Sequence, residues 1–534
     1  MTGPVSAGPA ATFTMALVCA PGRRNTLAMF DATPLLRSYA RHRLSRLSRM
    51  DPVSAQRRVL AKLLAQARTT RFGHDHGFAE IDGVESFQAR VPLRRFEQMW
   101  QDYWQPAFPQ IGGQTWPGPI PFFAETSGTS SGTTKYVPVS RQMVHANRRA
   151  ALDVLCFHMA ARPQSRVLGG LSFLLGGNPE MRQLAPGVRS GDLSGIAAAK
   201  VSWWASPYYY PQGALARIAD WEAKIDAACA DSLGRDIRMV GGTASWLLLA
   251  FDRLGELAGR PGTPVGVLYP KLELVVYGGV DFAPYRGRFQ AHLARGHADL
   301  REVYAASEGF IAAADRGVGE GLRLMVDNGL FFEFVPPDEL ESASPTRHWL
   351  ATAEVGVDYA VVLSTNAGCW GHVLGDTVRF VSLNPPRLLV TGRISTQLSA
   401  FGEHLTGAEL DRAVTAAADA IGAAVQDFSV TAVLPDDRPA QGGHCYIVEF
   451  DRMPDAAALA RFTEVLDRTL AAGNDDYRVH RAGDFGMAPP QVRAAPPGTF
   501  TAWMKARGKL GGQNKVPRVI TNAALWASLE AELE

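Results

Sequence analysis

Short apolar runs alternate with helical segments along most of the chain, and this alternation is the strongest constraint on its fold. The runs are rich in β-branched and aromatic residues and are bounded by turn-forming residues, as strands are. Helical periodicity separates them, for example over 141–159 and 213–230. Strands that alternate with helices predict a layered α/β domain. The clearest strand-like runs lie at 119–123, 167–175, 272–277 and 359–363.

Local signals mark an early helix and a hairpin. Apolar residues recur at helical spacing over 59–67, after the helix-start pair Asp51-Pro52. Further along, the apolar runs 322–326 and 330–335 flank Asn328-Gly329, a pair that favours a tight turn. We therefore predict a helix that begins near Asp51 and a β-hairpin over 322–335.

The character of the sequence changes after Arg393, where a shorter α+β pattern begins. We expect a large N-terminal domain over 29–393 and a small C-terminal domain over 394–534. Residues 1–28 are rich in Ala, Gly, Pro and Thr, and we expect a disordered extension there. In the small domain, a helix, two strands and a second helix are predicted at 409–421, 427–433, 445–450 and 459–470.

The charge balance and the hydropathy pattern restrict the partners. The 534 residues include 54 Lys and Arg and 52 Asp and Glu, which gives a formal net charge of +2. Dedicated nucleic-acid binders carry a large basic excess. No run approaches the roughly 18 apolar residues that a membrane-spanning helix needs. We therefore expect neither a nucleic-acid nor a membrane partner.

The cysteines and the N-terminal sequence indicate the cellular compartment of the protein. The five cysteines are far apart and form no C-x-x-C pair, so neither a disulfide framework nor a zinc knuckle is expected. This usage fits a reducing cytoplasm. The pair Arg23-Arg24 is similar to a twin-arginine signal, but Asp31, Pro34 and Arg37 interrupt the apolar run that export requires. We expect a cytoplasmic protein.

The segment 122–135 carries the most informative pattern. A short apolar strand leads into Ser127, Gly128, Thr129 and Ser130, and the segment ends at Lys135. Glycines let the backbone approach a ligand closely, while hydroxyls, main-chain N–H groups and a lysine suit phosphate oxygens. A Ser/Thr/Gly-rich surface loop has the same composition and remains the simpler alternative.

Two sharper motifs fit this segment less well. A Walker A loop needs G-x-x-x-x-G-K-[ST], which the spacing of Gly128, Gly132 and Lys135 does not provide. The stretch 128–132 formally fits the G-x-S-x-G elbow, with Ser130 as a hydrolase nucleophile, but that motif requires a helix directly afterwards. Residues 135–139 have an extended pattern instead, in which Pro138 disfavours a helix.

Three further segments matter through their order along the chain. Residues 304–308 offer an aromatic face, a hydroxyl and a carboxylate in Tyr304, Ser307 and Glu308. Asp376 precedes the predicted strand 377–381 and could accept both hydroxyls of a ribose, as carboxylates do. A third segment ends a strand at Arg393. Each pattern alone is weak, because such residues are common at turns and helix starts.

Together these segments resemble the Gretchen Hagen Three (auxin-responsive promoter) family of acyl-acid amido synthetases, in its bacterial branch. That family belongs to the adenylate-forming, firefly luciferase-like enzymes. The resemblance extends from about Gln56 to Arg518. It runs through 69–78, 91–92, 122–135, 304–309, 332–334, 375–380, 392–403, 474–477 and 512–518.

The resemblance implies a fold and a reaction. It implies a large N-terminal layered α/β domain of adenylate-forming type and a smaller, mobile α+β C-terminal domain. With ATP and Mg²⁺, a small carboxylic acid becomes an acyl-adenylate and pyrophosphate is released. An amine, typically that of an amino acid, then displaces AMP to give an amide. We expect the enzyme to be a monomer.

The resemblance also assigns roles to residues. Ser127, Gly128, Thr129 and Ser130 are expected at the phosphates, and Asp376 at the ribose. Arg393 is expected at the ribose and the hinge, and Lys515 is expected to close over the site from the small domain. Tyr304, Ser307 and Glu308 are expected at the nucleotide, with Glu308 as the Mg²⁺ ligand. Trp246 is expected to border the acyl pocket, although core packing is the simpler explanation for a tryptophan.

The chain departs from the family pattern just before Asp376. Gly371 stands where the family typically has arginine, and His372 where it has tyrosine. Losing an arginine beside an anionic intermediate removes a charge and a bidentate donor. This departure predicts a different acid substrate or reduced activity.

Three alternatives therefore remain open from the sequence. They are an acyl-CoA ligase, a serine hydrolase that uses Ser130, and a degenerate nucleotide-binding protein. The stretch His74-Asp75-His76 also raises the question of a metal site. The metal site lacks a third ligand at suitable spacing, so we do not expect it.

Overall fold

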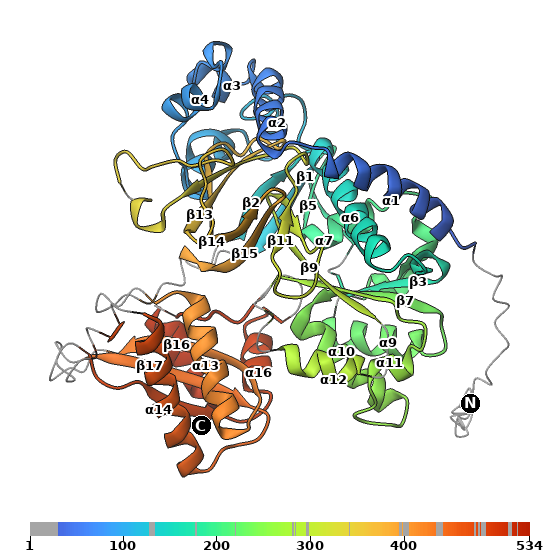
Figure 1. The fold of residues 1–534 in the computed structure, drawn as a ribbon, viewed down its shortest axis with the longest axis vertical. Helices are drawn as coiled ribbons and strands as arrows, with labels where there is room; N and C mark the ends of the chain where they lie inside the picture. Colours follow the sequence, from blue (N-terminus) through green and yellow to red (C-terminus); the bar gives the residue numbers. More distant parts are fainter. Residues whose placement is uncertain are drawn as a thin grey trace, which may run out of the picture. The chain divides into compact units, whose positions relative to one another are not determined.

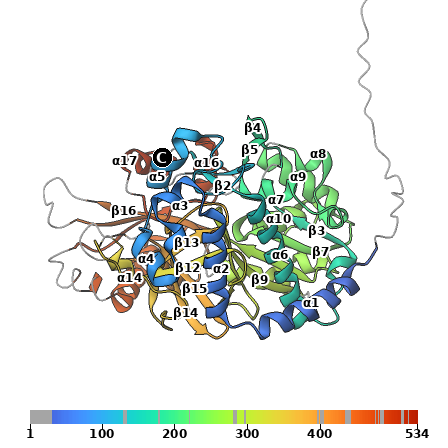
Figure 2. The ribbon, with the colours of Figure 1, turned by 90° about the horizontal axis from the view of Figure 1, so that it is seen from above.

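The computed structural model describes residues 30–127, 134–176, 179–218, 220–279, 282, 285–294, 298–340, 342–394, 398, 405–433, 442–474, 477–478, 481, 487–510, 515–520 and 522–533. The extension predicted at 1–28 lies outside these residues. So do Gly128, Thr129 and Ser130. Figures 1 and 2 show the ribbon from two directions.

Two helices open the described chain, α1 (Thr33–Ser48) and α2 (Pro52–Ala67). The predicted helix start is confirmed, since the Asp51 carboxylate accepts a hydrogen bond from the Ser54 amide at 2.8 Å and caps α2. Arg43 of α1 is buried and donates to the carboxylates of Asp153 and Asp327. A buried guanidinium needs such acceptors, so this cluster fastens α1 to the domain.

An eleven-stranded sheet forms the centre of the described large domain. Its strands β3, β6, β7, β8 and β9 pair in parallel, and β9 to β15 continue it with antiparallel pairs. In spatial order the strands are β12 (Leu330–Val335), β13 (Asp358–Thr365), β14 (His372–Leu383), β15 (Pro386–Arg393), β11 (Leu322–Leu324), β10 (Gly309–Ala313), β9 (Asp299–Ala306), β8 (Leu274–Gly278), β7 (Ile237–Thr243), β3 (Leu171–Leu174) and β6 (Tyr209–Tyr210).

Helices cover both faces of the parallel part (Figure 1). Val275 of β8 packs in a core with α9 (Trp221–Ser232), α10 (Ala244–Leu257) and α12 (Arg286–Leu293). Its neighbour Val276 packs on the opposite face, against side chains of α1 and α6 (Arg141–Ala161). Successive strand residues point to opposite faces, so the layered α/β prediction is confirmed. Shorter helices are α3 (Arg71–Asp75), α4 (Val84–Arg90), α5 (Phe96–Met99), α7 (Leu193–Ala199) and α11 (Val265–Leu268).

The prediction of one helix over 213–230 is wrong, because the structure has two helices there. The chain forms a short α8 (Gly213–Ala216) and then α9. Asp220 separates them, because its carboxylate accepts from the Ala223 amide at 2.8 Å and starts a new helix. Aspartate is a strong N-cap residue, so the sequence did contain the signal.

The predicted hairpin over 322–335 is also wrong. The strands β11 and β12 both form, and Gly329 has φ = +80°, but β11 pairs with β10 and β15 while β12 pairs with β13. The Gln56 side chain of α2 bonds to the connection between β11 and β12, which do not pair with each other. It donates to the carbonyls of Val326 and Leu330 at 2.8 and 2.9 Å. The tertiary contact therefore outweighs the local preference for a hairpin.

The sheet curls strongly between β9 and β14. These strands are four positions apart in the sheet, which at 4.7–4.9 Å per step would separate them by roughly 19 Å if the sheet were flat. Yet the Tyr304 hydroxyl of β9 donates to the Asp376 carboxylate of β14 at 2.7 Å. Two side chains cannot span a flat sheet of that width, so this part curves like a barrel wall.

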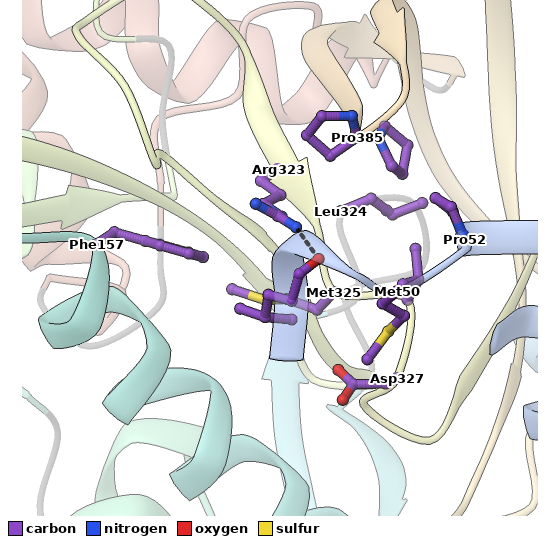
Figure 3. A pocket seen from close by; sticks show the side chains of 11 residues that line it. Met50, Pro52, Phe157, Arg323, Leu324, Met325, Asp327 and Pro385 are labelled. Carbon is purple, nitrogen blue, oxygen red and sulfur yellow. Dashed lines mark hydrogen bonds between the residues drawn. The ribbon is translucent and has the colours of Figure 1, made fainter. Parts of the chain in front are cut away.

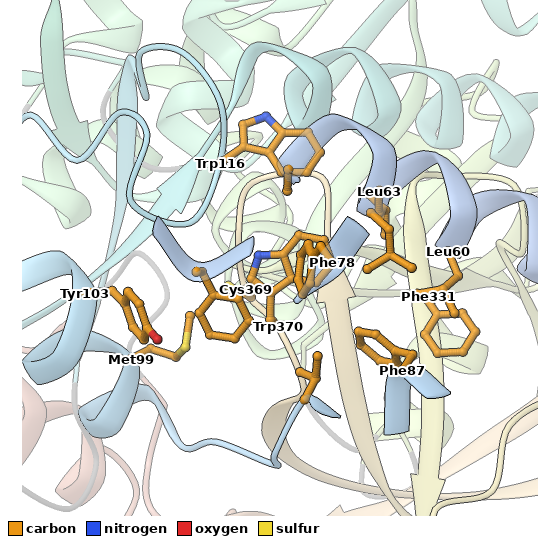
Figure 4. Close-up of a cluster of buried hydrophobic side chains, with 14 of the residues drawn as sticks. Leu60, Leu63, Phe78, Phe87, Met99, Tyr103, Trp116, Phe331, Cys369 and Trp370 are labelled. Carbon is orange, nitrogen blue, oxygen red and sulfur yellow. The ribbon is translucent and has the colours of Figure 1, made fainter. Parts of the chain in front are cut away.

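A second, four-stranded sheet contains the two strands on either side of the Ser/Thr/Gly-rich segment. Its order is β2 (Thr134–Val139), β1 (Phe122–Ser127), β5 (Val188–Gly191) and β4 (Arg182–Ala185). An aromatic core lies beside it, in which Trp370 packs edge-on against Phe78 and its ring N–H donates to the Thr115 carbonyl at 2.9 Å (Figure 4). This core anchors the chain just before Gly371 and β14.

The described C-terminal residues form the predicted α+β pattern. The capping box between Thr406 and Glu409 starts α13 (Gly407–Ile421), and the strands β16 (Val425–Val433) and β17 (Gly443–Phe450) pair antiparallel. The helix α14 (Ala456–Gly473) confirms the last predicted element. Further elements are β18 (Gln491–Ala495), which pairs with β17, α16 (Thr499–Ala506) and α17 (Ala523–Glu530).

Candidate functional site

The paired strands β1 and β2 flank the segment expected at the phosphates. Ser127 ends β1, and residues 128–133 lie outside the described chain. Lys135 of β2 lies 2.6 Å from the Glu97 carboxylate, with its ammonium 5.1 Å from the Phe96 ring centre. Burial raises the pKa of Glu97, but the Lys135 ammonium outweighs this effect and leaves that pKa below its usual range. Sequence reasoning missed Glu97, which belongs to no recognisable motif.

The extended pattern predicted over 135–139 is confirmed. The chain leaves the segment as strand β2 rather than as a helix. A G-x-S-x-G elbow exposes its serine at a strand-to-helix turn. The described residues that follow the segment, 134–139, form a strand, which does not fit that context and weakens the hydrolase alternative.

Tyr304 and Asp376 come together where β9 and β14 approach each other. Both side chains are buried, and the tyrosine hydroxyl donates to the aspartate at 2.7 Å. Near Asp376 the register with β13 shifts, and Gly375 adopts φ = +94°. Such bulges re-aim side chains beside functional sites. The structure therefore joins two residues that the sequence analysis placed separately at the nucleotide.

Ser307 and Glu308 form the turn between β9 and β10. Ser307 is buried, and one Glu308 carboxylate oxygen lies 3.6 Å from Nε2 of His372 at the start of β14. The Glu308 side chain is only 12% exposed. The site thus has a second contact between the β9–β10 hairpin and β14.

Gly371 differs from the family for a reason visible in the backbone. Its φ is +51°, and a Cβ at this position would lie 2.5 Å from the Pro92 carbonyl oxygen. The Gly371 carbonyl also accepts from the Arg94 amide at 2.8 Å. A side chain cannot be accommodated here without moving the backbone, so glycine suits this position better than arginine does.

Arg393 and Trp246 lie in different parts of the large domain. Arg393 ends β15 directly opposite Asp376 in the β14–β15 ladder. Trp246 lies in the first turn of α10, half-buried, with its ring edge-on to Trp221 at 5.1 Å. The neighbouring Lys224 donates to the Gly176 carbonyl at 2.9 Å, and burial lowers the pKa of its ammonium. The packing explanation for Trp246 therefore has support, and its place at an acyl pocket stays a prediction.

Lys515 is exposed, but it lies near the ends of the parallel strands. A methyl group at Gly279, which directly follows β8, would be 3.7 Å from the Lys515 ammonium and 3.9 Å from the Thr243 hydroxyl at the end of β7. Ligands of open α/β sheets bind at the carboxyl ends of parallel strands. Lys515 thus lies at an edge where a ligand is expected.

Glu308 is the residue that the sequence analysis predicts to hold Mg²⁺. In the part of the chain that the structure describes, no three His, Cys, Asp or Glu side chains are grouped to hold a metal, and His76 bonds to the Arg90 carbonyl instead. Mg²⁺ is commonly held by one or two carboxylates together with substrate phosphates and waters. A largely buried carboxylate in the turn between β9 and β10 fits that requirement.

Elsewhere the described chain has a small cavity and a buried thiol, and neither suits a ligand. The cavity in Figure 3, between Met50 and Arg323, has a volume of about 10 Å³, room for one water at most. Burial raises the pKa of the Cys156 thiol to about 12, which leaves it unreactive. Of the helices described, none has both the length and the hydrophobicity to cross a bilayer.

Comparison with known protein families matches three domains of a single family to this chain. The profiles of the GH3 family N-terminal, central and C-terminal domains match residues 41–254, 323–393 and 408–524 and together span most of the chain.

Among curated proteins, a probable indole-3-acetic acid-amido synthetase GH3.9 of Oryza sativa subsp. japonica is 31% identical over 43% of this chain. The match covers 56% of that relative, so the chain spans little more than half of its length. A second rice protein, the probable indole-3-acetic acid-amido synthetase GH3.2, is 24% identical over 88% of both chains.

Solved structures show the same fold. The GH3.15 acyl acid amido synthetase aligns with a TM-score of 0.77 at 18% identity, over 93% of this chain and 96% of that one. A 2-hydroxyisobutyryl-CoA ligase aligns with a TM-score of 0.55 at 16% identity, over 89% and 90% of the two chains. The expected adenylate-forming fold is therefore confirmed.

Proposed function

Because this chain belongs to the GH3 family, we propose that it is an ATP-dependent acyl-acid amido synthetase. Its substrates would be a small carboxylic acid and an amine such as that of an amino acid. The observation that carries the proposal is the buried pair of Tyr304 and Asp376 where β9 and β14 meet. A carboxylate held in a set position suits the two hydroxyls of a ribose.

The reaction would proceed in two steps. A carboxylate oxygen of the acid attacks the α-phosphorus of ATP, and the bond to the bridging oxygen breaks to release pyrophosphate. The amine nitrogen then attacks the acyl carbon, loses a proton and displaces AMP. AMP leaves far more readily than oxide does, so the enzyme mainly has to position the reactants and stabilise the phosphate charge.

The large domain supplies the residues for nucleotide binding. Ser127 and the following Gly128, Thr129 and Ser130 would contact the phosphates, with Lys135 beside them. Tyr304 and Ser307 would line the nucleotide. Asp376 would hold the ribose, and Arg393 lies opposite it in the ladder. Trp246 would border the acyl group.

Glu308 would hold Mg²⁺ together with the phosphates. When bound, the ion would neutralise phosphate charge. The protein's part is to keep an anionic oxygen ready at the site, and the nearly buried carboxylate in a tight hairpin turn supports this role.

The C-terminal domain would complete the site by movement. We place its start at residue 394, where the central-domain match ends. Lys515 would approach the phosphates when this domain closes, which would also exclude water from the acyl-adenylate. Its present position near the end of β8 supports such access. We propose a cytoplasmic monomer.

A panel of aryl and alkyl acids tests the function. With Mg-ATP, at least one acid should release pyrophosphate and AMP, and adding amino acids should yield an amide. Release of ADP and phosphate would contradict adenylation. An acid-dependent product with coenzyme A but none with any amine would instead favour an acyl-CoA ligase, whose fold the chain shares.

A further inference from the structure

His372 is buried at the edge of the proposed nucleotide site, where it contacts Glu308. The side chain is 4% exposed, and Nε2 lies 3.6 Å from a Glu308 carboxylate oxygen. Its other nitrogen, Nδ1, has no hydrogen-bond partner among the described residues. The polar contact that the imidazole makes is therefore directed at Glu308.

The backbone around His372 explains how the ring is held. Arg94 pairs with this segment on both sides, since its amide donates to the Gly371 carbonyl at 2.8 Å and its carbonyl accepts from the Val373 amide at 2.9 Å. The same path excludes any side chain at Gly371. Trp370 is fixed in the aromatic core on the preceding side. The imidazole thus extends from a backbone that is restrained in both directions.

Glu308 lies in the two-residue turn between β9 and β10. A glutamate side chain has several rotamers, and each group that contacts its carboxylate narrows the choice. His372 is one such group. The contact from His372 crosses from β14 to the β9–β10 hairpin, as the contact between Asp376 and Tyr304 does. Each contact links one residue of β14 to that hairpin.

We propose that His372 is a positioning residue for Glu308. It holds the carboxylate in the orientation that receives the metal–nucleotide complex, and it does so from a position where the restrained backbone leaves room for an imidazole. The departure at residues 371 and 372 is then a working arrangement rather than a sign of degeneration. This inference rests on the proposed function, because it assigns Glu308 to Mg²⁺.

Binding of α,β-methylene-ATP, which cannot release pyrophosphate, tests the proposal without turnover. Calorimetric titrations at a series of MgCl₂ concentrations give the magnesium concentration for half-maximal binding. Residues that orient a metal ligand typically contribute 10–100-fold to metal affinity, so His372→Phe should raise this concentration about tenfold or more. Binding without magnesium should not change. His372→Gln, which keeps an N–H donor, should recover most of the loss.

A second histidine provides a matched control. His292 of α12 is also buried and lies 3.3 Å from the Asp252 carboxylate of α10, so His292→Phe should leave the magnesium dependence unchanged. In a Glu308→Gln background, His372→Phe should have no further effect. If His372→Phe does not fold, His372→Leu takes its place beside His372→Gln.

Three results would overturn the proposal. They are an unchanged magnesium dependence in folded His372→Phe, equal losses in the Gln and Phe variants, and nucleotide binding by the unsubstituted protein that does not respond to magnesium. Failure of the proposed function would look different. The magnesium-dependent binding and its loss in His372→Phe would persist, but no acid would release pyrophosphate.

Discussion

Replacing Tyr304 by Phe isolates the hydroxyl group that contacts Asp376. The ring remains in place, so any stacking with a nucleotide is preserved, and only the donor at 2.7 Å from the carboxylate is lost. Both side chains are more than nine-tenths buried. Water therefore cannot readily replace the missing hydroxyl, and the variant reports what that bond does for the ribose site.

The expected magnitude follows from the charge and the burial. A hydrogen bond to a charged group contributes about 1.5–3 kcal/mol. If all of it served to position Asp376, kcat/KM for ATP would fall by about 10- to 150-fold, since 1.36 kcal/mol corresponds to a factor of ten. Asp376→Ala removes the carboxylate itself and should cost about two orders of magnitude.

A double-mutant cycle on kcat/KM for ATP separates the two residues. If the hydroxyl acts through Asp376, Tyr304→Phe should have almost no effect once Asp376 is alanine. Tyr359→Phe is the control, because that buried hydroxyl accepts from the Glu354 amide. Additive effects of the two substitutions would refute the reasoning. So would wild-type kinetics in a folded Asp376→Ala variant.

Three further outcomes are expected. Lys515→Ala should slow adenylation strongly and spare amide formation from a preformed acyl-adenylate, and equal effects in single-turnover assays of both steps would remove Lys515 from its role. Gly371→Ala should lower the melting temperature more than Gly375→Ala, because both glycines have positive φ but only at Gly371 would a Cβ meet backbone, the Pro92 carbonyl at 2.5 Å. Burial raises the pKa of Asp299, but His158 and Arg162 outweigh it and bring the pKa to about 2. This carboxylate should therefore stabilise the fold above its unfolded pKa of about 3.9, and its contribution should disappear as the pH falls towards 2, a loss that acid unfolding of Asp299→Asn should not show.

The sequence predicts those elements whose signals are local. The helix that begins after Asp51 has a cap and an apolar stripe within a few turns, and the strand at 359–363 has a continuous apolar run. Both form close to where they are expected. The elements of the C-terminal domain follow the same rule, because periodicity alone distinguishes its helices from its strands.

Predictions that needed distant contacts failed. The Asn328-Gly329 turn favours a hairpin, but Gln56, more than 260 residues away, bonds to both sides of that connection and β11 pairs elsewhere. Likewise, no local pattern shows that Tyr304 contacts Asp376 or that His372 contacts Glu308. Resemblance to a family can assign both members of such a pair to one site, but only the curvature of the sheet shows which atoms meet.

That curvature gives the site its cooperative character. On the β9–β10 hairpin, Tyr304 and Glu308 are four residues apart, and their partners Asp376 and His372 are four residues apart on β14. Both contacts exist only because β9 and β14, four strands apart, curl toward each other. A change that flattens the curl would loosen both pairs at once, whereas a change in one side chain acts first on its own pair.

Tyr304→Phe should therefore alter the dependence on ATP more than that on magnesium, and His372→Phe should do the reverse. Equal changes of the ATP and magnesium dependences in both variants would contradict this separation. The two contacts would then maintain the curvature of the sheet rather than bind separate parts of the ligand.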